Sequence, residues 1–376
     1  MRIWIDGYEA NIGQRLGSSQ WAFELLSNLE KIDQKNEYTI LLPNAPLGDL
    51  PKERLGWQYK ILRPKRLWTK IALPGVLYLS RDKPDIFLSP THYIPRFCPS
   101  GIKRICTIFD LSFLHFPEMF NKKDLWQLKA WTKFSAKNAD HIITISNFSK
   151  QDIVEQYGVP KEKISMIYPG YNKDKFKYQI SKIKDEEVKK KYKIGDSYII
   201  YIGTIQPRKN LVRLVEAFAK IDRGLQLVIV GKTTGEDREG WKFEEILAAP
   251  KRLGIEDRVK FLGFVPANEL TLLLSSSLAF VLPSLWEGFG IPVLEAMGSG
   301  APVIVSNVSS LPEVVGSAGL LVDPYSVDQI EQAIRTITSD KNLQQKYSKA
   351  GLLQAKKFSW EKTAREVLKI FPKLVN

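Results

Sequence analysis

Short, strongly apolar runs alternate with helical patterns along most of this 376-residue chain. The apolar runs include RIWID, YTILLP, DIFLSP and HIITIS in the first half, and YIIYIG, LQLVIVG, LAFVLP and PVIVSN in the second. Strands that are apolar on both faces and are separated by helices are typical of parallel sheets covered on both sides. We therefore predict an α/β fold built from doubly wound sheets.

A polar, lysine-rich stretch, KDKFKYQISKIKDEEVKKKYKIGDS, interrupts this alternation near the middle of the chain. The strand–helix pattern then begins again, which indicates two domains, as the length of the chain also does. We predict a Rossmann-like domain over residues 1–176, a second one over 177–358, and a C-terminal helix over 359–376 that crosses back to the first domain. Ser359 is a suitable N-cap for that helix. The two domains are expected to face a cleft.

The composition indicates an ordinary folded protein rather than a disordered one, because 44% of the residues are hydrophobic and 26% are charged. The chain reaches Asp6 before an apolar run can form, so we expect no signal peptide. The most apolar tract, LTLLLSSSLAFVLPSLW, is broken by serines and Pro283 and is short for a membrane span. The spacing of Cys98 and Cys106 fits neither a zinc site nor a redox-active pair, so we expect two free thiols. Free thiols are typical of proteins in a reducing cytoplasm.

The formal charge of +14 is concentrated in the first half of the chain. Residues 51–100 hold ten Lys and Arg against three Asp and Glu, whereas residues 201–350 hold sixteen against seventeen. The sharpest basic cluster, RPKRLWTK, begins at Arg63 and surrounds Trp68. A basic surface with an aromatic side chain suits an anionic membrane. Such a surface suits nucleic acid equally well. A third interpretation is that the basic side chains are only solvated and keep the protein in solution.

Three strand-to-helix turns in the second half carry groups that suit a diphosphate. Arg208 and Lys209 follow the run YIIYIG, Lys232 follows LQLVIVG, and the glycine-rich SLWEGFG precedes a helix that begins at Pro292. Ligands of open α/β sheets bind beyond the carboxyl ends of the strands. Cations and helix N-termini both attract anions there. These turns therefore predict a diphosphate site.

The stretch SLWEGFGIPVLEAMGSG holds two carboxylates in otherwise uncharged surroundings. We place Glu287 in the loop before the helix and Glu295 one turn inside it. Ionised carboxylates only accept hydrogen bonds, so they suit sugar hydroxyls better than phosphate. Gly288 and Gly290 allow the backbone to approach a ligand closely. A diphosphate flanked by two sugars is a nucleotide sugar, which is the ligand we predict; the alternative is that Glu295 only supports its own helix.

The longer stretch PSLWEGFGIPVLEAMGSGAPVIVSNVSSLPEVVGSAGLLVDP resembles the signature of glycosyltransferase family 4, whose members are retaining enzymes with the GT-B fold. Glu287 and Glu295 match the two ends of the E-x7-E motif of that family. The resemblance covers nearly the whole chain, since other segments fit the family pattern as well: SPTHYIP, TIFDLSFLHFPEMF, ADHIITISNFS, YIGTIQPRKNLVRLVEAF, VKFLGFVPANEL and FSWEKTA.

The resemblance implies a role for each matching residue. Arg208 and Lys209 should hold the donor diphosphate and support the leaving group. Glu287 should lie against the transferred sugar, and Glu295 should accept hydrogen bonds from the ribose hydroxyls. The other donor-side positions are Gly17 near the diphosphate and acceptor, Thr204 and Lys232, Phe264 and Val265 facing the base, and Phe289, Gly290 and Ile291 beside the sugar.

The chain departs from the family pattern at Phe109, because many relatives have a His in front of the following Asp, and that His usually faces the donor sugar. Asp110, counted here with the catalytic residues, and His92, on the acceptor side, are then the polar candidates of the first domain. Asp110 as a turn cap and His92 as a packing residue are the alternatives. The chain contains no Asp-x-Asp, so we predict metal-independent transfer without a cofactor. The resemblance implies that the anomeric configuration is retained.

The segments GTIQPRKN and DLSFLHFPE resemble mannosyltransferase-like members of the family, which favours transfer of mannose from GDP-mannose, with UDP-sugars left open. The resemblance implies a growing or lipid-linked glycan as acceptor, in the cytoplasm or at the inner face of a membrane, and no nucleic acid. Two alternatives stay open: a nucleotide-sugar epimerase of the same architecture, and a non-catalytic protein that binds sugars or nucleotides.

Overall fold

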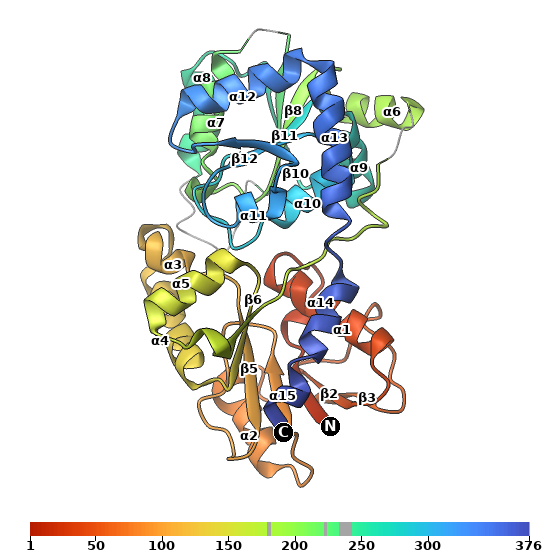
Figure 1. Cartoon of the computed structure of the whole chain (residues 1–376), viewed down its shortest axis with the longest axis vertical. Coiled ribbons are helices and arrows are strands. Elements are labelled where there is room, and N and C mark those ends of the chain that lie inside the picture. Colours follow the sequence, from red (N-terminus) through yellow and green to blue (C-terminus); the bar gives the residue numbers. More distant parts are fainter. Residues whose placement is uncertain (179–181, 222–223, 233–242, 376) are drawn as a thin grey trace. The chain divides into compact units, whose positions relative to one another are not determined.

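The computed structural model describes residues 1–178, 182–221, 224–232 and 243–375. The chain divides into two compact units (Figure 1). Unit 1 consists of Met1–Leu111, Lys123–Gly170 and Trp360–Asn376, and unit 2 consists of Ser112–Lys122 and Tyr171–Ser359. None of the described helices is both long enough and apolar enough to cross a bilayer.

The core of unit 1 is a parallel sheet with the strand order β3-β2-β1-β4-β5-β6-β7. Its strands are β1 (Arg2–Asp6), β2 (Glu37–Leu42), β3 (Trp57–Ile61), β4 (Ile86–Ser89), β5 (Lys103–Ile108), β6 (His141–Thr144) and β7 (Ile164–Met166). The order reverses between β1 and β4, as in a doubly wound fold. The central strands are buried on both faces, which explains why they read as continuous apolar runs.

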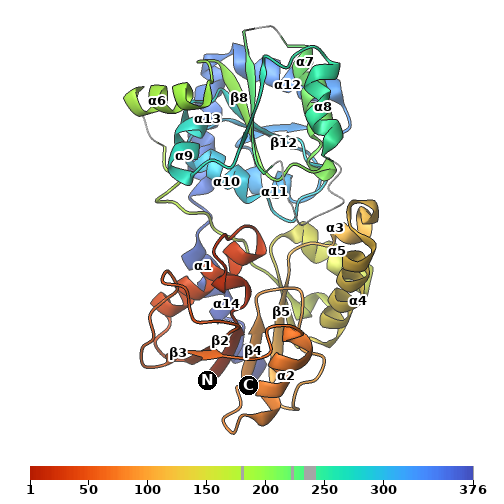
Figure 2. The ribbon, with the colours of Figure 1, turned by 180° about the vertical axis from the view of Figure 1, so that it is seen from behind.

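Helices cover both faces of this sheet (Figures 1 and 2). They are η1 (Glu9–Asn11), α1 (Ser18–Ile32), η2 (Trp68–Ala72), α2 (Leu73–Leu79), α4 (Lys122–Asn138), α5 (Asn147–Tyr157) and η4 (Lys161–Lys163), with α14 (Trp360–Leu368) and α15 (Phe371–Val375) at the C-terminus. The single helix predicted over 359–376 is thus two helices. Pro372 lacks the N–H that a continuous helix would bond to the preceding turn.

The C-terminal segment returns to unit 1, as predicted. α14 packs against α1, where the rings of Trp360 and Trp21 lie 5.9 Å apart at a steep angle. Thr363 also donates a hydrogen bond of 2.7 Å to the carbonyl of Tyr168. The chain end is therefore held by apolar burial and by the hydrogen bond of Thr363.

Unit 2 contains a second parallel sheet with the strand order β10-β9-β8-β11-β12-β13. Its strands are β8 (Tyr198–Ile202), β9 (Gln226–Val230), β10 (Val259–Gly263), β11 (Ala279–Leu282), β12 (Val303–Ser306) and β13 (Gly319–Val322). The described helices are α3 (Ser112–His115), η3 (Pro117–Met119), α6 (Lys182–Tyr192), η5 (Pro207–Lys209), α7 (Leu211–Ala219), α8 (Glu244–Arg252), α9 (Ala267–Ser276), α10 (Ile291–Gly298), α11 (Leu311–Val315), α12 (Val327–Ser339) and α13 (Lys341–Ala355). They lie on both faces of the sheet (Figure 2).

The observed units differ from the predicted domains in two places. Ser112–Lys122 lies between two pieces of unit 1 in sequence but packs with unit 2. The reason is an aromatic contact, because the ring of His115 stacks on that of Trp286 with centroids 4.1 Å apart. Sequence order alone does not reveal such a contact. The first unit also passes to the second after Gly170, whereas the prediction placed this change at residue 176.

Candidate functional site

The turn after β8 places two cations at the carboxyl end of the sheet of unit 2. Arg208 and Lys209 form the end of η5, and Asn210 follows with left-handed backbone at φ 61°. Asn adopts this conformation more readily than most residues. The Asn210 amide donates to the carbonyls of Pro283 and Pro324 at 3.0 and 2.6 Å. The turn is thereby held against the segments that follow β11 and β13.

Both cations reach Glu287, which lies in the loop after β11. Lys209 Nζ is 2.5 Å from Glu287 Oε1, and Arg208 Nη1 is 3.5 Å from Oε2. Ser284 donates a hydrogen bond of 2.7 Å to Oε1. Burial by itself would raise the pKa of Glu287, but Lys209, Arg208 and Ser284 outweigh it and hold the pKa below its usual value. The carboxylate is therefore ionised at neutral pH and acts only as an acceptor.

Two consecutive serines hold the loop that carries Glu287. The N–H of Glu287 donates to Ser309 Oγ at 3.1 Å. Ser310 Oγ donates to the carbonyls of Glu287 and Phe289 at 2.9 and 3.0 Å. Arg208 donates to the carbonyl of Trp286 on the same loop. The loop backbone is thus fixed on both sides of the carboxylate.

Glu295 lies in α10, one turn inside the helix, as predicted. Its carboxyl group is half-buried, and burial raises its pKa to about 7. Within residues 1–178, 182–221, 224–232 and 243–375, this carboxyl group forms no hydrogen bond or ion pair. A carboxyl group held in this way gains more from a ligand hydroxyl than one that is already paired.

Gly290 marks the start of α10 and has φ 100°, a conformation that residues with a side chain rarely adopt. A Cβ atom there would also lie 2.8 Å from Leu311 Cδ2. Phe289 is buried and packs edge-on against Phe358, with ring centroids 5.7 Å apart. Ile291, the first residue of the helix, is half-buried. The backbone conformation and the close approach of Leu311 therefore both require glycine at position 290, and the predicted approach of a ligand to this turn stays a prediction.

The remaining predicted donor residues of unit 2 also follow strand ends. Thr204 follows β8, and its hydroxyl oxygen accepts a hydrogen bond of 3.1 Å from Gln206. Lys232 is exposed after β9. After β10, Phe264 is 63% exposed, whereas its neighbour Val265 is buried. The exposed aromatic ring is thus available to a planar ligand, and Val265 anchors the loop.

The predicted residues of unit 1 lie at the carboxyl end of its own sheet. Gly17 precedes α1 with φ 57°. His92 Nε2 accepts the N–H of Phe109 at 3.1 Å, and the two rings stack at 5.6 Å. Burial lowers the pKa of His92 to about 4, although Asp110 acts in the opposite direction. His92 is therefore neutral and holds the strand end, while Asp110 is half-buried beside it.

Phe109, at the position where many relatives have His, turns its ring into the protein. It contacts Trp21 edge-on at 6.0 Å, as well as His92. An aromatic ring in this environment contributes packing and no hydrogen bond. The polar group of the relatives is thus replaced by a partly buried apolar ring.

Sequence reasoning missed the residues that support Glu287. Ser284 stands three residues before Glu287, and a hydroxyl followed by a carboxylate at that spacing is a signal that was overlooked. Ser309 and Ser310 lie more than twenty residues further on, and only the fold brings them to the loop. His115 was missed for the same reason.

Two family models match the chain. "Glycosyltransferase Family 4" matches residues 17–175 and "Glycosyl transferases group 1" matches residues 183–354. A curated relative from Escherichia coli, O-antigen chain mannosyltransferase B, is 32% identical over 83% of this chain and 78% of its own length. The matches cover both units.

Solved structures resemble the chain over nearly its full length. Sucrose-phosphate synthase from Thermosynechococcus elongatus has a TM-score of 0.77 at 19% identity, covering 99% of this chain and 98% of the other. The Anabaena protein HepE, solved in complex with UDP-glucose, has a TM-score of 0.75 at 18% identity and covers 99% of both chains. The predicted GT-B fold with two Rossmann-like domains is confirmed by these likenesses.

Proposed function

The chain belongs to glycosyltransferase family 4, and from this premise we propose that it transfers a mannosyl residue from a nucleotide-diphosphate sugar to a glycan or lipid-linked glycan. We further propose that the anomeric configuration is retained and that no metal ion takes part. The observation that carries the proposal is the cluster of Arg208, Lys209 and Glu287 at the carboxyl ends of β8 and β11. The name of the E. coli relative supports mannose as the sugar.

In this proposal, Arg208 and Lys209 exchange their contacts with Glu287 for contacts with the donor diphosphate. When the bond between the anomeric carbon and the phosphate oxygen breaks, its electron pair goes to the diphosphate. The leaving group then carries more negative charge than the bound donor does. Two fixed cations consequently stabilise the transition state more than the ground state, which is the condition for catalysis.

The two glutamates have different proposed tasks because their environments differ. Glu287, whose pKa is held low, remains an anion and accepts hydrogen bonds from the hydroxyls of the transferred sugar. Glu295, whose pKa is raised to about 7, accepts from the ribose hydroxyls of the donor. Phe264 and Val265 are proposed to face the base, and the amides around Gly290 to face the sugar.

GDP-mannose is the donor that we favour, because the named relative is a mannosyltransferase. The UDP-glucose complex of HepE keeps UDP-sugars as the second candidate. A thermal-shift comparison of GDP-mannose, UDP-glucose, GDP and UDP separates them, because a ligand that binds the folded state raises its apparent stability. We expect the guanine nucleotides to give the larger shift.

An anionic membrane is the second partner that we propose, and α4 offers the contact surface. Trp126, Lys129, Lys133 and Lys137 are spaced by three and four residues, so they share one face of this helix. All four are exposed, Trp126 by 67%. Cations near an anionic membrane contribute about 1 kcal/mol each. We therefore place the enzyme at the cytoplasmic face of a membrane, where a lipid-linked acceptor is reached.

The transfer proposal is tested by release of GDP from GDP-mannose with mannobiose as the trial acceptor. We expect Lys209→Ala to lower the turnover at least 100-fold, whereas Lys349→Ala, an exposed lysine of α13, should leave it unchanged. Glu287→Ala should remove turnover while largely sparing nucleotide binding. The anomeric configuration of the product, read by NMR, tests retention.

The same assay discriminates the alternatives. Formation of an epimerised nucleotide sugar without GDP release would show an epimerase. Nucleotide binding without any turnover, across the donors and a panel of oligosaccharide acceptors, would show a non-catalytic binding protein. Unchanged turnover in Lys209→Ala would contradict the proposed role of the cation cluster.

A further inference from the structure

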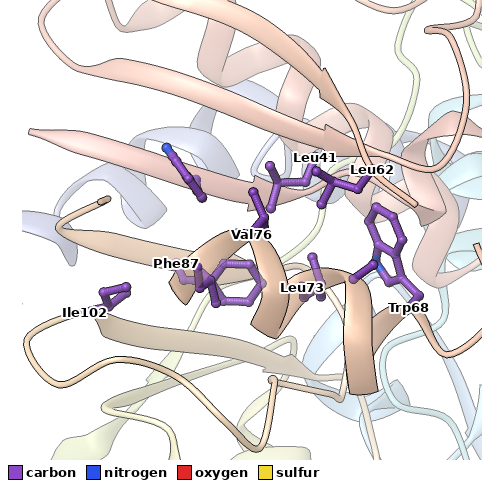
Figure 3. Packing of buried hydrophobic residues seen from close by; sticks show 10 residues of the cluster. Leu41, Leu62, Trp68, Leu73, Val76, Phe87 and Ile102 are labelled. Atoms are coloured by element: carbon purple, nitrogen blue, oxygen red, sulfur yellow. The ribbon is translucent and has the colours of Figure 1, made fainter. Parts of the chain in front are cut away.

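One face of the unit 1 sheet is only partly covered by helix. η2 and α2 bury the half nearer the carboxyl ends of the strands, where Trp68, Leu73 and Val76 pack on Leu41 and Phe87 (Figure 3). α2 is short and ends at Leu79. The other half of the same face, toward the amino ends of β1, β2 and β3, lies beyond the end of that helix.

This uncovered half forms a cavity of about 470 Å³. The strand register sets Trp4, Thr39 and Gln58 side by side across β1, β2 and β3, with Arg2 and Glu37 as the next pair toward the amino ends. Lys60 and the loop Ser80–Asp82 complete the wall. The volume lies within the range of small-molecule sites in proteins, roughly 300–1,000 Å³.

The polar lining of this cavity is unusual for a parallel sheet. Parallel strands are normally covered on both faces and apolar on both. Here Glu37, Thr39, Gln58 and Lys60 point to one face of two adjacent strands. The side chains also order one another, because Gln58 donates to Thr39 Oγ1 at 3.0 Å and Lys60 donates to Ser80 Oγ at 3.2 Å.

Trp4 forms the floor of the cavity and is 6% exposed. In the part of the chain that the structure describes, its indole N–H donates to no protein group. Lys60 Nζ lies 5.3 Å from the centroid of the Trp4 ring. The indole nitrogen is not fully enclosed, so a ligand oxygen in the cavity would accept a hydrogen bond from it.

The chemistry of the lining selects one class of ligand. The lining combines donors with acceptors: the donors are the Trp4 indole, the Gln58 amide, Arg2, Lys60 and Arg81, and the acceptors are Glu37 and Asp82. Hydroxyl groups both donate and accept, so a hydroxylated ligand matches this mixture. The cations of the lining, Arg2, Lys60 and Arg81, stand beside two carboxylates, and Asp82 already lies 3.6 Å from Arg2, so little positive charge remains for a phosphate. An apolar ligand would leave the polar groups without partners.

We propose that the cavity bounded by Trp4, Thr39, Gln58, Glu37, Lys60 and Asp82 is a second carbohydrate site, which binds a hexose oligosaccharide. It lies at the amino ends of the strands of unit 1, whereas Gly17, His92 and Asp110 lie at the carboxyl ends. A glycan held here is a part of the acceptor or product chain already made, and this identification rests on the proposed function. The site would raise the affinity for long chains over short ones.

The test uses the full chain with saturating GDP and titrates mannotriose. The indole N–H signals of the nine tryptophans are followed by ¹H–¹⁵N NMR, and Trp4→Phe identifies the signal of Trp4. We expect mannotriose to shift that signal. The double variant Glu37→Ala/Gln58→Ala should raise the dissociation constant at least tenfold without changing the thermal midpoint. The matched control is Gln151→Ala/Glu155→Ala, which removes the same two residue types from the exposed face of α5.

A titration that leaves the Trp4 signal in place would overturn the proposal, and so would a Glu37→Ala/Gln58→Ala variant that binds mannotriose as tightly as the control. Loss of GDP release with retained mannotriose binding at Trp4 would remove the transferase proposal and keep the carbohydrate site. The Glu287→Ala variant should bind mannotriose normally, because its substitution lies in unit 2.

Discussion

Replacing Lys209 with Met should destabilise unit 2 in a manner that depends on Glu287. The substitution keeps an unbranched side chain and removes the charge 2.5 Å from the carboxylate. Breaking a buried ion pair on one side costs about 3–5 kcal/mol. Arg208 and Ser284 still face the carboxylate, so we expect a loss of about 2–3 kcal/mol in the free energy of unfolding at pH 7.

The direction of the pKa shift of Glu287 determines how the stability loss in Lys209→Met depends on pH. In the folded protein the pKa of Glu287 is depressed, so its stabilisation is fully present above the unfolded pKa of about 4.3 and is lost as the pH falls through the folded pKa. Without Lys209 the depression is smaller. The difference between wild type and Lys209→Met should therefore be full at pH 7 and shrink below about pH 4.3.

The assay is urea unfolding followed by tryptophan fluorescence, with a double-mutant cycle as the control. Lys209→Met/Glu287→Gln leaves no unpaired anion, so it should recover at least about 1 kcal/mol relative to Lys209→Met alone. A free energy of unfolding for Lys209→Met within about 0.5 kcal/mol of wild type would refute the reasoning. A double variant whose loss of stability equals the sum of the losses in Lys209→Met and Glu287→Gln would refute it as well.

Three further predictions concern neighbouring positions. Gly298→Ala places a Cβ 2.5 Å from Tyr171 Cε2, and the rigid ring should make this cost about 1–3 kcal/mol in thermal or urea unfolding; adding Tyr171→Leu should restore part of it. Glu295 has its folded pKa raised to about 7, so the folded state binds the extra proton and wild-type stability should fall as the pH rises from about 4.5 to 7. Glu295→Gln should abolish this slope, and an unchanged slope would exclude Glu295 as its source. Asn210→Ala loses two hydrogen bonds to buried carbonyls and the tolerance for φ 61°, so it should cost about 2–4 kcal/mol, whereas Asn210→Gly should cost less because glycine accepts the backbone conformation.

Much of the fold follows from local pattern. The runs YIIYIG and LAFVLP became β8 and β11 because a strand apolar on both faces can be buried only in a covered parallel sheet. The turns after them were placed correctly for a similar reason, since glycine and proline mark strand and helix ends by backbone preference alone. The edge strand β3 was not predicted, because its exposed side chains interrupt the apolar pattern.

The charged residues of the site could be predicted from the sequence, but the residues that hold them in place could not. Arg208, Lys209 and Glu287 stand in recognisable turns, but their mutual contacts join residues nearly eighty positions apart. Nothing in the sequence distinguishes Ser309 and Ser310 from other serines, and only the fold places them beside the loop of Glu287. Phe109 reads as a lost polar contact in the sequence, whereas in the structure it is a packed ring.

The sequence by itself determined the alternation of strands and helices, the two sheets and the positions of the turns that carry charge, because these depend on residues a few positions apart. Only the tertiary structure decided that Ser112–Lys122 joins unit 2, that Lys209 and Ser284 share one carboxylate oxygen, and that the short α2 leaves a polar cavity over Trp4. Those outcomes depend on which distant segments pack together, and that is set by burial and steric fit over the whole unit rather than by any local pattern.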